Sequence, residues 1–221
     1  MNIRFLQKGN AVGEIYLYDE VGDGFFTGMG AKTFQQELTK LGRVDAINLH
    51  INSPGGSVFD GVTIYNLLAQ HPARINVSVD GIAASIAAVI AMAGDEINMA
   101  DNAMMMIHNT HTVAVGGAED LRKTADLLET LNGVTAQTFA TRSGQTLAAV
   151  HKIMDDETWL TAAQARELGF ADNVTESMPI AACLNGNAAR MFRAVPTRLA
   201  FTIGQRVARD MVATMHKRTS G

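Results

Sequence analysis

Three kinds of residue in this chain could together carry out acyl transfer: a serine at a strand-to-helix turn, a histidine that ends an apolar strand, and an acid in a short turn. Ser85 follows Gly81-Ile-Ala-Ala, where small neighbours would let a substrate carbonyl reach its hydroxyl. Backbone N–H groups at the start of a helix are unpaired and lie at the positive end of the helix dipole. They can stabilise an oxyanion, so this turn could support a nucleophilic serine.

A serine nucleophile needs a base, and the base needs an orienting acid. His108 lies in the apolar segment 103–109 (AMMMIHN), and the acidic run 155–157 (DDE) directly precedes Thr158-Trp-Leu. A second glycine turn, residues 53–56 (SPGG), would allow the backbone to approach a ligand closely. Taken singly, these features are explained as turns, a helix cap and a strand-end histidine. The residues alone favour those ordinary explanations.

Hydrophobic periodicity predicts the elements that must position these residues. Apolar and polar residues alternate over 46–53 (AINLHINS) and 74–80 (RINVSVD), each followed by a glycine turn and a helical pattern, and Gly81 is expected to end the second strand. Repeated strand–turn–helix units predict an α/β fold with helices covering sheets. Further strands are predicted over 13–21, 96–100 and 103–109, with a short strand at Thr158-Trp-Leu. Helices are predicted over 31–41, 58–71, 83–94, 118–142, 146–154 and 161–169. The last of these helices begins with a capping box.

Composition indicates a globular protein without disulfides or a membrane anchor. The chain has 221 residues, 47% of them hydrophobic, and a single cysteine, Cys183. This excludes disorder as the main state, a disulfide framework and a cysteine-rich zinc module. The longest apolar run, residues 81–94, is shorter than the roughly 18 residues of a membrane span, and the first ten residues lack a secretory pattern. We expect a soluble, cytoplasmic protein.

Charge is unevenly distributed and suggests two parts. Residues 185–221 carry seven basic residues against one acid, whereas the whole chain has a net charge of −4, so the remainder is at −10. We expect a catalytic body over residues 1–174 and a linker with a basic helical tail over 175–221. The apolar i+4 stripe of the tail favours packing on protein over nucleic-acid binding.

His108 and His111, three apart on a predicted strand, would face opposite sides, so no metal site is expected.

Four segments together resemble the proteolytic subunit of the Clp protease family: residues 46–57 (AINLHINSPGGS), 81–87 (GIAASIA), 103–109 and 157–172 (ETWLTAAQARELGFAD). They occur in unbroken order within residues 13–174. The resemblance implies a crotonase-like (ClpP) superhelix of ββα units and a serine peptidase without a cofactor. Members of this family assemble into rings, often two stacked rings with the active sites inside, so a homo-oligomeric ring is expected.

Carried over residue by residue, the family's nucleophile corresponds to Ser85 and its general base to His108. The two oxyanion donors correspond to the backbone N–H groups of Gly56 and Ile86.

The family's aspartate, two residues ahead of the aromatic Trp159, corresponds here to Glu157. Glutamate can orient an imidazole as aspartate does, with a longer arm. Asp156 and Asp155 remain alternative candidates for the acid.

Two departures from the family pattern bear on partners. The chain begins almost directly at its first predicted strand, so the segment that forms axial pore loops is expected to be absent or reorganised, and an unfoldase ATPase partner is not expected. After His108 the chain reads Asn-Thr-His-Thr where typical members have Gln-Pro.

The chain also resembles the head-maturation (prohead) proteases of phages and prophages, in the motifs NSPGGSVFDG, VIAMAGDEI, MMMIHN and ETW. The substrate of those proteases is a scaffold or capsid protein. Such a protein would act in the host cytoplasm.

The expected function is therefore a serine endopeptidase that cleaves through an acyl-enzyme, in prohead maturation or as an ATP-dependent Clp-type proteolytic subunit. One alternative is a ring-forming assembly or scaffold protein with weak catalysis, which the Glu157 substitution suggests. The other is a crotonase-type acyl-CoA enzyme, since that superfamily shares the oxyanion turns; acyl-CoA binding would distinguish it.

Overall fold

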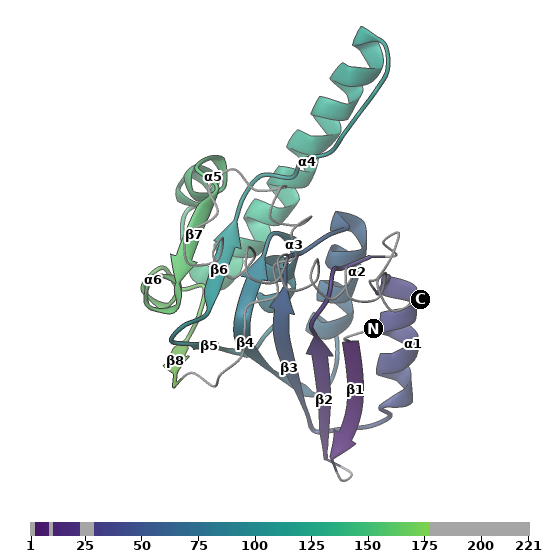
Figure 1. Cartoon of the computed structure of the whole chain (residues 1–221), viewed down its shortest axis with the longest axis vertical. Helices are drawn as coiled ribbons and strands as arrows, with labels where there is room; N and C mark the ends of the chain where they lie inside the picture. Colours follow the sequence, from purple (N-terminus) through teal and green to yellow (C-terminus); the bar gives the residue numbers. More distant parts are fainter. Residues whose placement is uncertain (1–2, 9–10, 23–28, 177–221) are drawn as a thin grey trace, which may run out of the picture.

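A computed structural model of the chain describes residues 3–8, 11–22 and 29–176 (Figure 1). One sheet of eight strands runs through these residues in the order β1-β2-β3-β4-β5-β8, and β6 pairs with both β4 and β7. The strands are β1 (Ile3–Lys8), β2 (Val12–Leu17), β3 (Ala46–Ser53), β4 (Arg74–Ala84), β5 (Glu96–Ala100), β6 (Met104–Ile107), β7 (Thr158–Thr161) and β8 (Asn173–Thr175). The helices are α1 (Ala31–Lys40), α2 (Val58–Ala69), α3 (Ile86–Ala91), α4 (Ala118–Ser143), α5 (Leu147–Asp155) and α6 (Ala162–Glu167).

The α/β layering predicted from the periodicity is confirmed. Strands β2, β3, β4, β5, β6 and β8 are parallel, whereas β1 pairs antiparallel with β2 and β7 pairs antiparallel with β6. One set of alternating side chains on the central strands, such as Leu49 and Val77, is buried in the core, and α1, α2 and α3 lie along this part of the sheet (Figure 1). Most predicted elements are present, including the capping box at Thr161, but β1 and β8 were not predicted and α3 is shorter than the helix predicted over 83–94. The predicted basic tail lies outside the described residues.

Strand β4 is longer than its sequence pattern predicts, and its length creates the site. We expected Gly81 to end the strand, but β4 continues to Ala84. Its first half pairs with β5 and its last residues, from Ile82 onward, pair with β6, so the backbone beyond Gly81 still has ladder partners. Because the strand changes neighbours, the ends of β4 and β6 emerge side by side.

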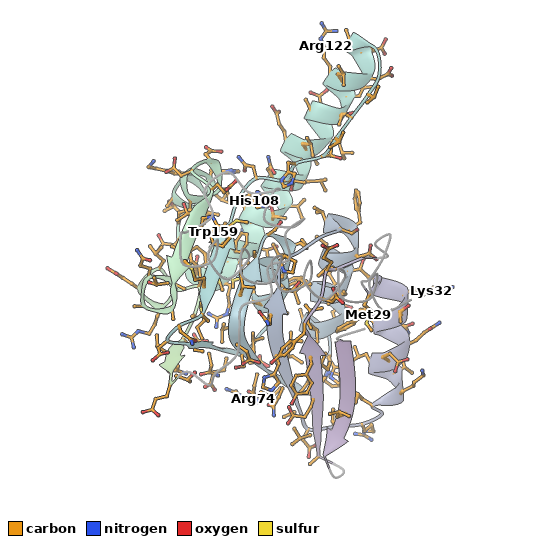
Figure 2. The ribbon with its side chains drawn as sticks, in the orientation of Figure 1. Met29, Lys32, Arg74, His108, Arg122 and Trp159 are labelled. Carbon is orange, nitrogen blue, oxygen red and sulfur yellow. The ribbon has the colours of Figure 1, made fainter. Side chains whose placement is uncertain are left out.

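Helix α4 projects from the body along its N-terminal half (Figure 1). The helix is buried only at its C-terminal end, where Phe139 and Ala140 pack into the core. Leu121 is 44% exposed, because this end of the helix has no sheet beneath it in the single chain. Arg122 marks this far end, well away from His108 at the base of the projection (Figure 2).

A polar network crosses the sheet on the side chains that alternate with the core. The Nδ1 atom of His50 lies 2.8 Å from the Asp80 carboxylate, and its Nε2 atom lies 3.3 Å from Glu14. The hydroxyls of Tyr18 and Ser78 donate to the same Asp80 carboxylate. The hydrogen bond with Asp80 raises the pKa of His50, although partial burial opposes the rise. Burial alone would raise the pKa of Asp80, but its three hydrogen bonds outweigh burial and lower it.

This network predicts a pH-dependent stability. The pKa of His50 is higher in the folded chain than in the unfolded chain, where it is about 6.5. Its contribution to the free energy of unfolding is therefore complete below that pH and is lost as the pH rises through the folded pKa. Urea unfolding should show that the stability difference between the wild type and His50→Gln shrinks from about pH 6 to about pH 9. A difference that stays constant with pH would contradict the assignment.

Candidate active site

Ser85 lies at the sharp turn between β4 and α3, in a strained backbone conformation. Its φ of 56° and ψ of −127° fall in a region that side chains other than glycine rarely adopt. The turn is held by the hydrogen bond from the Ser85 N–H to the Met106 carbonyl, 2.9 Å long, and by the start of α3. The Ser85 side chain makes no capping hydrogen bond to that helix, so the explanation of this serine as a helix cap is wrong.

The Ser85 hydroxyl instead lies against His108. The distance from Ser85 Oγ to His108 Nε2 is 2.8 Å. The pairing of Ala84 with Met106 produces this contact, because each strand delivers its residue just beyond the same end of the ladder. A hydroxyl at this distance can transfer its proton to a neutral imidazole.

The glycine turn between β3 and α2 presses directly against Ser85. A Cβ atom added to Gly55 would lie 2.8 Å from the Ser85 Cβ and 2.7 Å from the Ala84 carbonyl oxygen. Gly55 also has a φ of 95°, so both its conformation and its close contact require glycine. The turn serine Ser53 accepts from the Gly55 N–H and donates to the Asp19 carbonyl, so its hydroxyl holds the turn.

The two N–H groups predicted as oxyanion donors belong to the two turns that meet at Ser85. Gly56 forms a parallel bridge with Val21. In this bridge the Val21 N–H donates to the Gly55 carbonyl, and the Ser57 N–H donates to the Val21 carbonyl. In such a bridge the N–H of the central residue points away from its partner strand, so the Gly56 N–H remains available to an acceptor. Ile86 is the first residue of α3, where a helix leaves its N–H unpaired.

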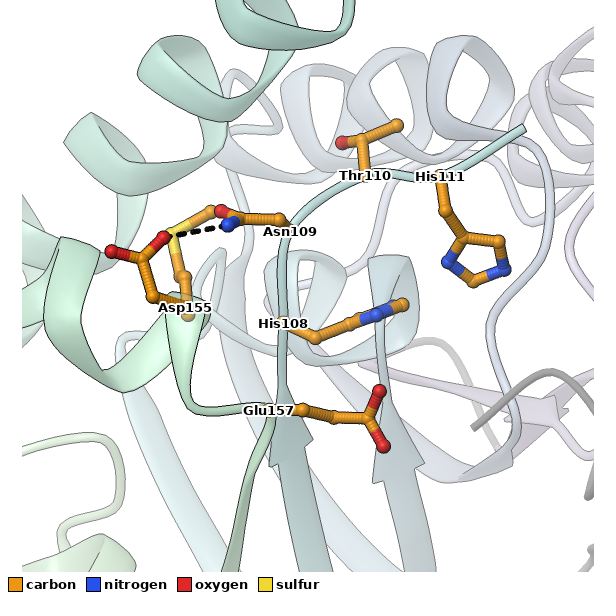
Figure 3. A pocket seen from close by; sticks show the side chains of 7 residues that line it. His108, Asn109, Thr110, His111, Asp155 and Glu157 are labelled. Carbon is orange, nitrogen blue, oxygen red and sulfur yellow. Dashed lines mark hydrogen bonds between the residues drawn. The ribbon is translucent and has the colours of Figure 1, made fainter. Parts of the chain in front are cut away.

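The structure separates the three candidate acids. Asp156 pairs with Lys152 on the outer side of α5, at 2.8 Å. Asp155 accepts a 2.7 Å hydrogen bond from the Asn109 side chain. Glu157, in the left-handed conformation with a φ of 47°, extends its carboxylate into the pocket that His108 also lines (Figure 3). Of the three, Glu157 is therefore the acid that faces the histidine.

Two hollows adjoin this group. A small apolar pocket borders both Ser85 and His108; its other lining residues are Val58, Ile86, Val89, Thr110, Thr135 and Phe139. A larger pocket of about 300 Å³ lies beside His108; its other lining residues are Asn109, Thr110, His111, Met154, Asp155 and Glu157 (Figure 3).

His111 corrects a sequence expectation. We expected His108 and His111 to face opposite sides of a strand, but β6 ends at Ile107 and the two rings lie 5.0 Å apart. Because the segment beyond β6 is no longer extended in the ladder, the alternation of faces does not apply. Within the described ranges no three His, Cys, Asp or Glu side chains are grouped as metal ligands would be.

Two asparagines that the sequence did not single out hold the segment after β6. Asn109 donates to Asp155, and Asn132 of α4 accepts a 2.7 Å hydrogen bond from the Thr110 N–H. The replacement of the family's Gln-Pro by Asn-Thr is the sequence signal that could have identified both. Proline would have no N–H to donate to Asn132, and asparagine provides the amide that meets Asp155.

Comparison with known proteins agrees with this geometry. The model of the family described as Clp protease matches residues 11–178. The chain belongs to the Clp protease family. The ATP-dependent Clp protease proteolytic subunit of Bacteroides fragilis strain ATCC 25285 is 34% identical over 149 residues, which cover 65% of this chain and 72% of that protein. Proteolytic subunit 1 of Protochlamydia amoebophila is 31% identical over 168 residues, covering 74% of this chain and 80% of that protein.

The fold comparison gives the same family architecture. A point mutant of ClpP1 from Listeria monocytogenes superimposes with a TM-score of 0.65 and 22% sequence identity, covering 74% of this chain and 91% of that one. The protein is thus a ClpP-like serine protease with a ClpP-like α/β fold. In the described part of the chain, no helix has both the length and the apolar character of a membrane span.

Proposed function

We propose that this Clp-family protease cleaves peptide bonds by a two-step acyl transfer centred on Ser85. His108 Nε2 accepts the hydroxyl proton as Ser85 Oγ attacks the substrate carbonyl, and the Glu157 carboxylate stabilises the imidazolium. The N–H groups of Gly56 and Ile86 donate to the tetrahedral oxyanion. His108 then returns the proton to the leaving amine as the C–N bond breaks, and water attacks the resulting ester by the same route.

The observation that carries this proposal is the 2.8 Å contact between Ser85 Oγ and His108 Nε2 at a strained turn. A serine used only for structure would satisfy its hydroxyl locally, without a φ of 56°. Strain of this kind costs on the order of 1–3 kcal/mol and persists where surrounding structure enforces it. This cost favours a functional explanation over the ordinary one of a turn residue.

Labelling with a fluorophosphonate probe tests the proposed nucleophile. We expect one adduct, on the peptide that contains Ser85, because its hydroxyl is the one activated by a hydrogen-bonded imidazole. Peptide mass spectrometry would locate it, and labelling should weaken as the pH falls through the range in which imidazoles become protonated. A folded protein that is labelled elsewhere, or not at all, would contradict the proposal.

The walls of the hollow next to Ser85, which measures about 20 Å³ in this structure, favour an apolar P1 residue, the one that contributes the scissile carbonyl. Val58, Val89 and Phe139 provide apolar walls, and no charged side chain lines this pocket within the described residues. Burial of an apolar side chain there is favourable, whereas a charged one would lose its hydration without a partner.

We further propose a homo-oligomeric ring, supported by the exposed apolar side chains of the projection. Val113 and Val115 are 95% and 97% exposed, and Leu121 and Leu127 on the projecting half of α4 are also exposed. A projecting helix with such side chains is typical of a contact surface. Analytical ultracentrifugation should show assemblies that are weakened by the double substitution Leu121→Glu/Leu127→Glu, whereas a monomeric wild type would contradict the ring.

For the biological role we propose prohead maturation, on the sequence motifs that resemble phage head-maturation proteases. The alternative is an ATP-dependent proteolytic subunit, since the relatives from Bacteroides fragilis and Protochlamydia amoebophila carry that name. Specific cleavage of the capsid or scaffold protein encoded nearest to this gene, without ATP, would support the first role. Degradation of folded substrates only with an unfoldase and ATP would support the second.

A further inference from the structure

The segment that carries the proposed base leaves the sheet directly at that residue. Strand β6 ends at Ile107, so His108 is the first residue beyond the paired strand, and residues 108–117 form neither helix nor strand. Ladder hydrogen bonds therefore fix the backbone on one side of His108 only. The other side needs a different support if Nε2 is to stay 2.8 Å from Ser85 Oγ.

Asn132 of α4 gives the segment such a support. Its Oδ1 atom accepts the 2.7 Å hydrogen bond from the Thr110 N–H, across 22 positions of sequence. Thr110 follows His108 and Asn109 along the segment, two residues beyond the base (Figure 3). Because a residue has one backbone N–H, this bond fixes the peptide plane that joins Asn109 to Thr110.

Asn132 lies on the part of α4 that is packed against the body. Thr135 and Ala136, three and four positions further along, are 5% and 0% exposed, whereas Leu127 on the projecting side is 49% exposed. Residues three and four positions apart share one face of a helix. The acceptor atom is therefore carried by a helix face that is held in place before any substrate binds.

This bond is better protected from water than the other contact of the segment. The hydrogen bond from Asn109 to Asp155 is exposed, whereas that from Thr110 to Asn132 is partly buried. Thr110 also lines the small hollow that borders Ser85 and His108. A displacement at Thr110 would therefore alter the reacting groups directly, and a misplacement of about 1 Å can cost on the order of 10²-fold in rate.

We propose that Asn132 is a positioning residue for His108, because through the Thr110 N–H it fixes the backbone that presents the base to Ser85. The proposal deepens the proposed function and rests on it, since it assumes that His108 is the base. Proline, which typical family members have at the position of Thr110, restricts its own backbone. In this chain the hydrogen bond to Asn132 supplies the restriction instead.

The rate of fluorophosphonate labelling at Ser85 tests this role in the full-length protein. Asn132→Leu removes the acceptor at similar volume and should lower the maximal labelling rate constant about tenfold, with little change in the apparent affinity for the probe. Asn132→Asp keeps an oxygen acceptor and should recover most of the rate. The control, Gln137→Met, removes an exposed amide of α4 that bonds Thr141 on the same helix, and should label like the wild type.

Removing the donor instead of the acceptor gives a second test. Thr110→Pro has no N–H for Asn132 to accept. In that background the further change Asn132→Leu should alter the labelling rate constant by less than about twofold, because the two changes remove the same bond. A second tenfold fall would show that Asn132 acts by another route, and the proposal would be wrong.

The outcomes separate this role from folding and from the function beneath it. If Asn132→Leu lowers only the fraction of protein that is labelled, with the rate constant unchanged, Asn132 is merely structural and the positioning role is refuted, whereas the serine peptidase stands. An equal fall for Asn132→Leu and Gln137→Met would also refute it, because any change on α4 would then have the effect. If Ser85 of the wild type is not labelled, both proposals fail.

Discussion

Replacing Ser85 with alanine will reduce kcat for peptide hydrolysis by at least about 10³-fold and abolish fluorophosphonate labelling, because the acyl-enzyme can no longer form. The hydroxyl removed is the one that lies 2.8 Å from His108. Its loss should not unfold the protein, since the side chain caps no helix and its backbone bond to Met106 is retained. Steady-state kinetics and thermal melts measured on the same preparation check both statements.

The matched control for this change is Ser57→Ala. Ser57 lies at the neighbouring glycine turn, but its hydroxyl accepts from the Asp60 N–H and caps α2. Loss of such a cap costs about 1 kcal/mol of stability, so the control should melt at a lower temperature and still be labelled at Ser85. Substantial peptidase activity in Ser85→Ala, or loss of labelling in Ser57→Ala alone, would show that Ser85 is not the nucleophile.

The second large effect is expected at the acid. Glu157→Gln should lower kcat by about 10³- to 10⁴-fold, because a neutral amide cannot stabilise the imidazolium and can bind the wrong histidine tautomer. Fluorophosphonate labelling should slow in parallel, since it depends on the same base. Glu157→Asp, with a carboxylate on a shorter arm, should recover part of the lost rate. Pre-steady-state measurement of acylation would check the expected order: wild type, then Asp, then Gln.

The neighbouring acids provide the control for this assignment. Asp156→Asn removes an equal charge from a side chain that pairs with Lys152, and should keep kcat close to the wild-type value. If Asp156→Asn or Asp155→Asn abolished acylation while Glu157→Gln did not, the triad would have a different acid. If none of the three mattered, the enzyme would work as a Ser85–His108 pair, with a weakly oriented base.

Asn132 connects the proposed ring contacts to the catalytic base. Its side chain holds the Thr110 N–H, two residues beyond His108, and it belongs to the same helix α4 whose far half projects from the body.

The sequence alone determined the local units of this protein. Strand β3 and helix α2 follow from residue periodicity and glycine placement within short windows, and the structure has them where they were predicted. The family resemblance further identified Ser85 and His108, and these two side chains are in hydrogen-bond contact. The strands, helices and turns were predictable because they depend on neighbours in the chain.

Tertiary structure decided what depends on distances between elements. It extended β4 past Gly81 because β6 supplies ladder partners, placed His111 beside His108 because the strand ends early, and left Leu121 exposed. The family spacing had selected Glu157, and the tertiary structure gave its two acidic neighbours other partners, Asn109 for Asp155 and Lys152 for Asp156. Side-chain direction at such a turn is fixed by backbone dihedrals and by partners far away in sequence, such as Asn109 for Asp155.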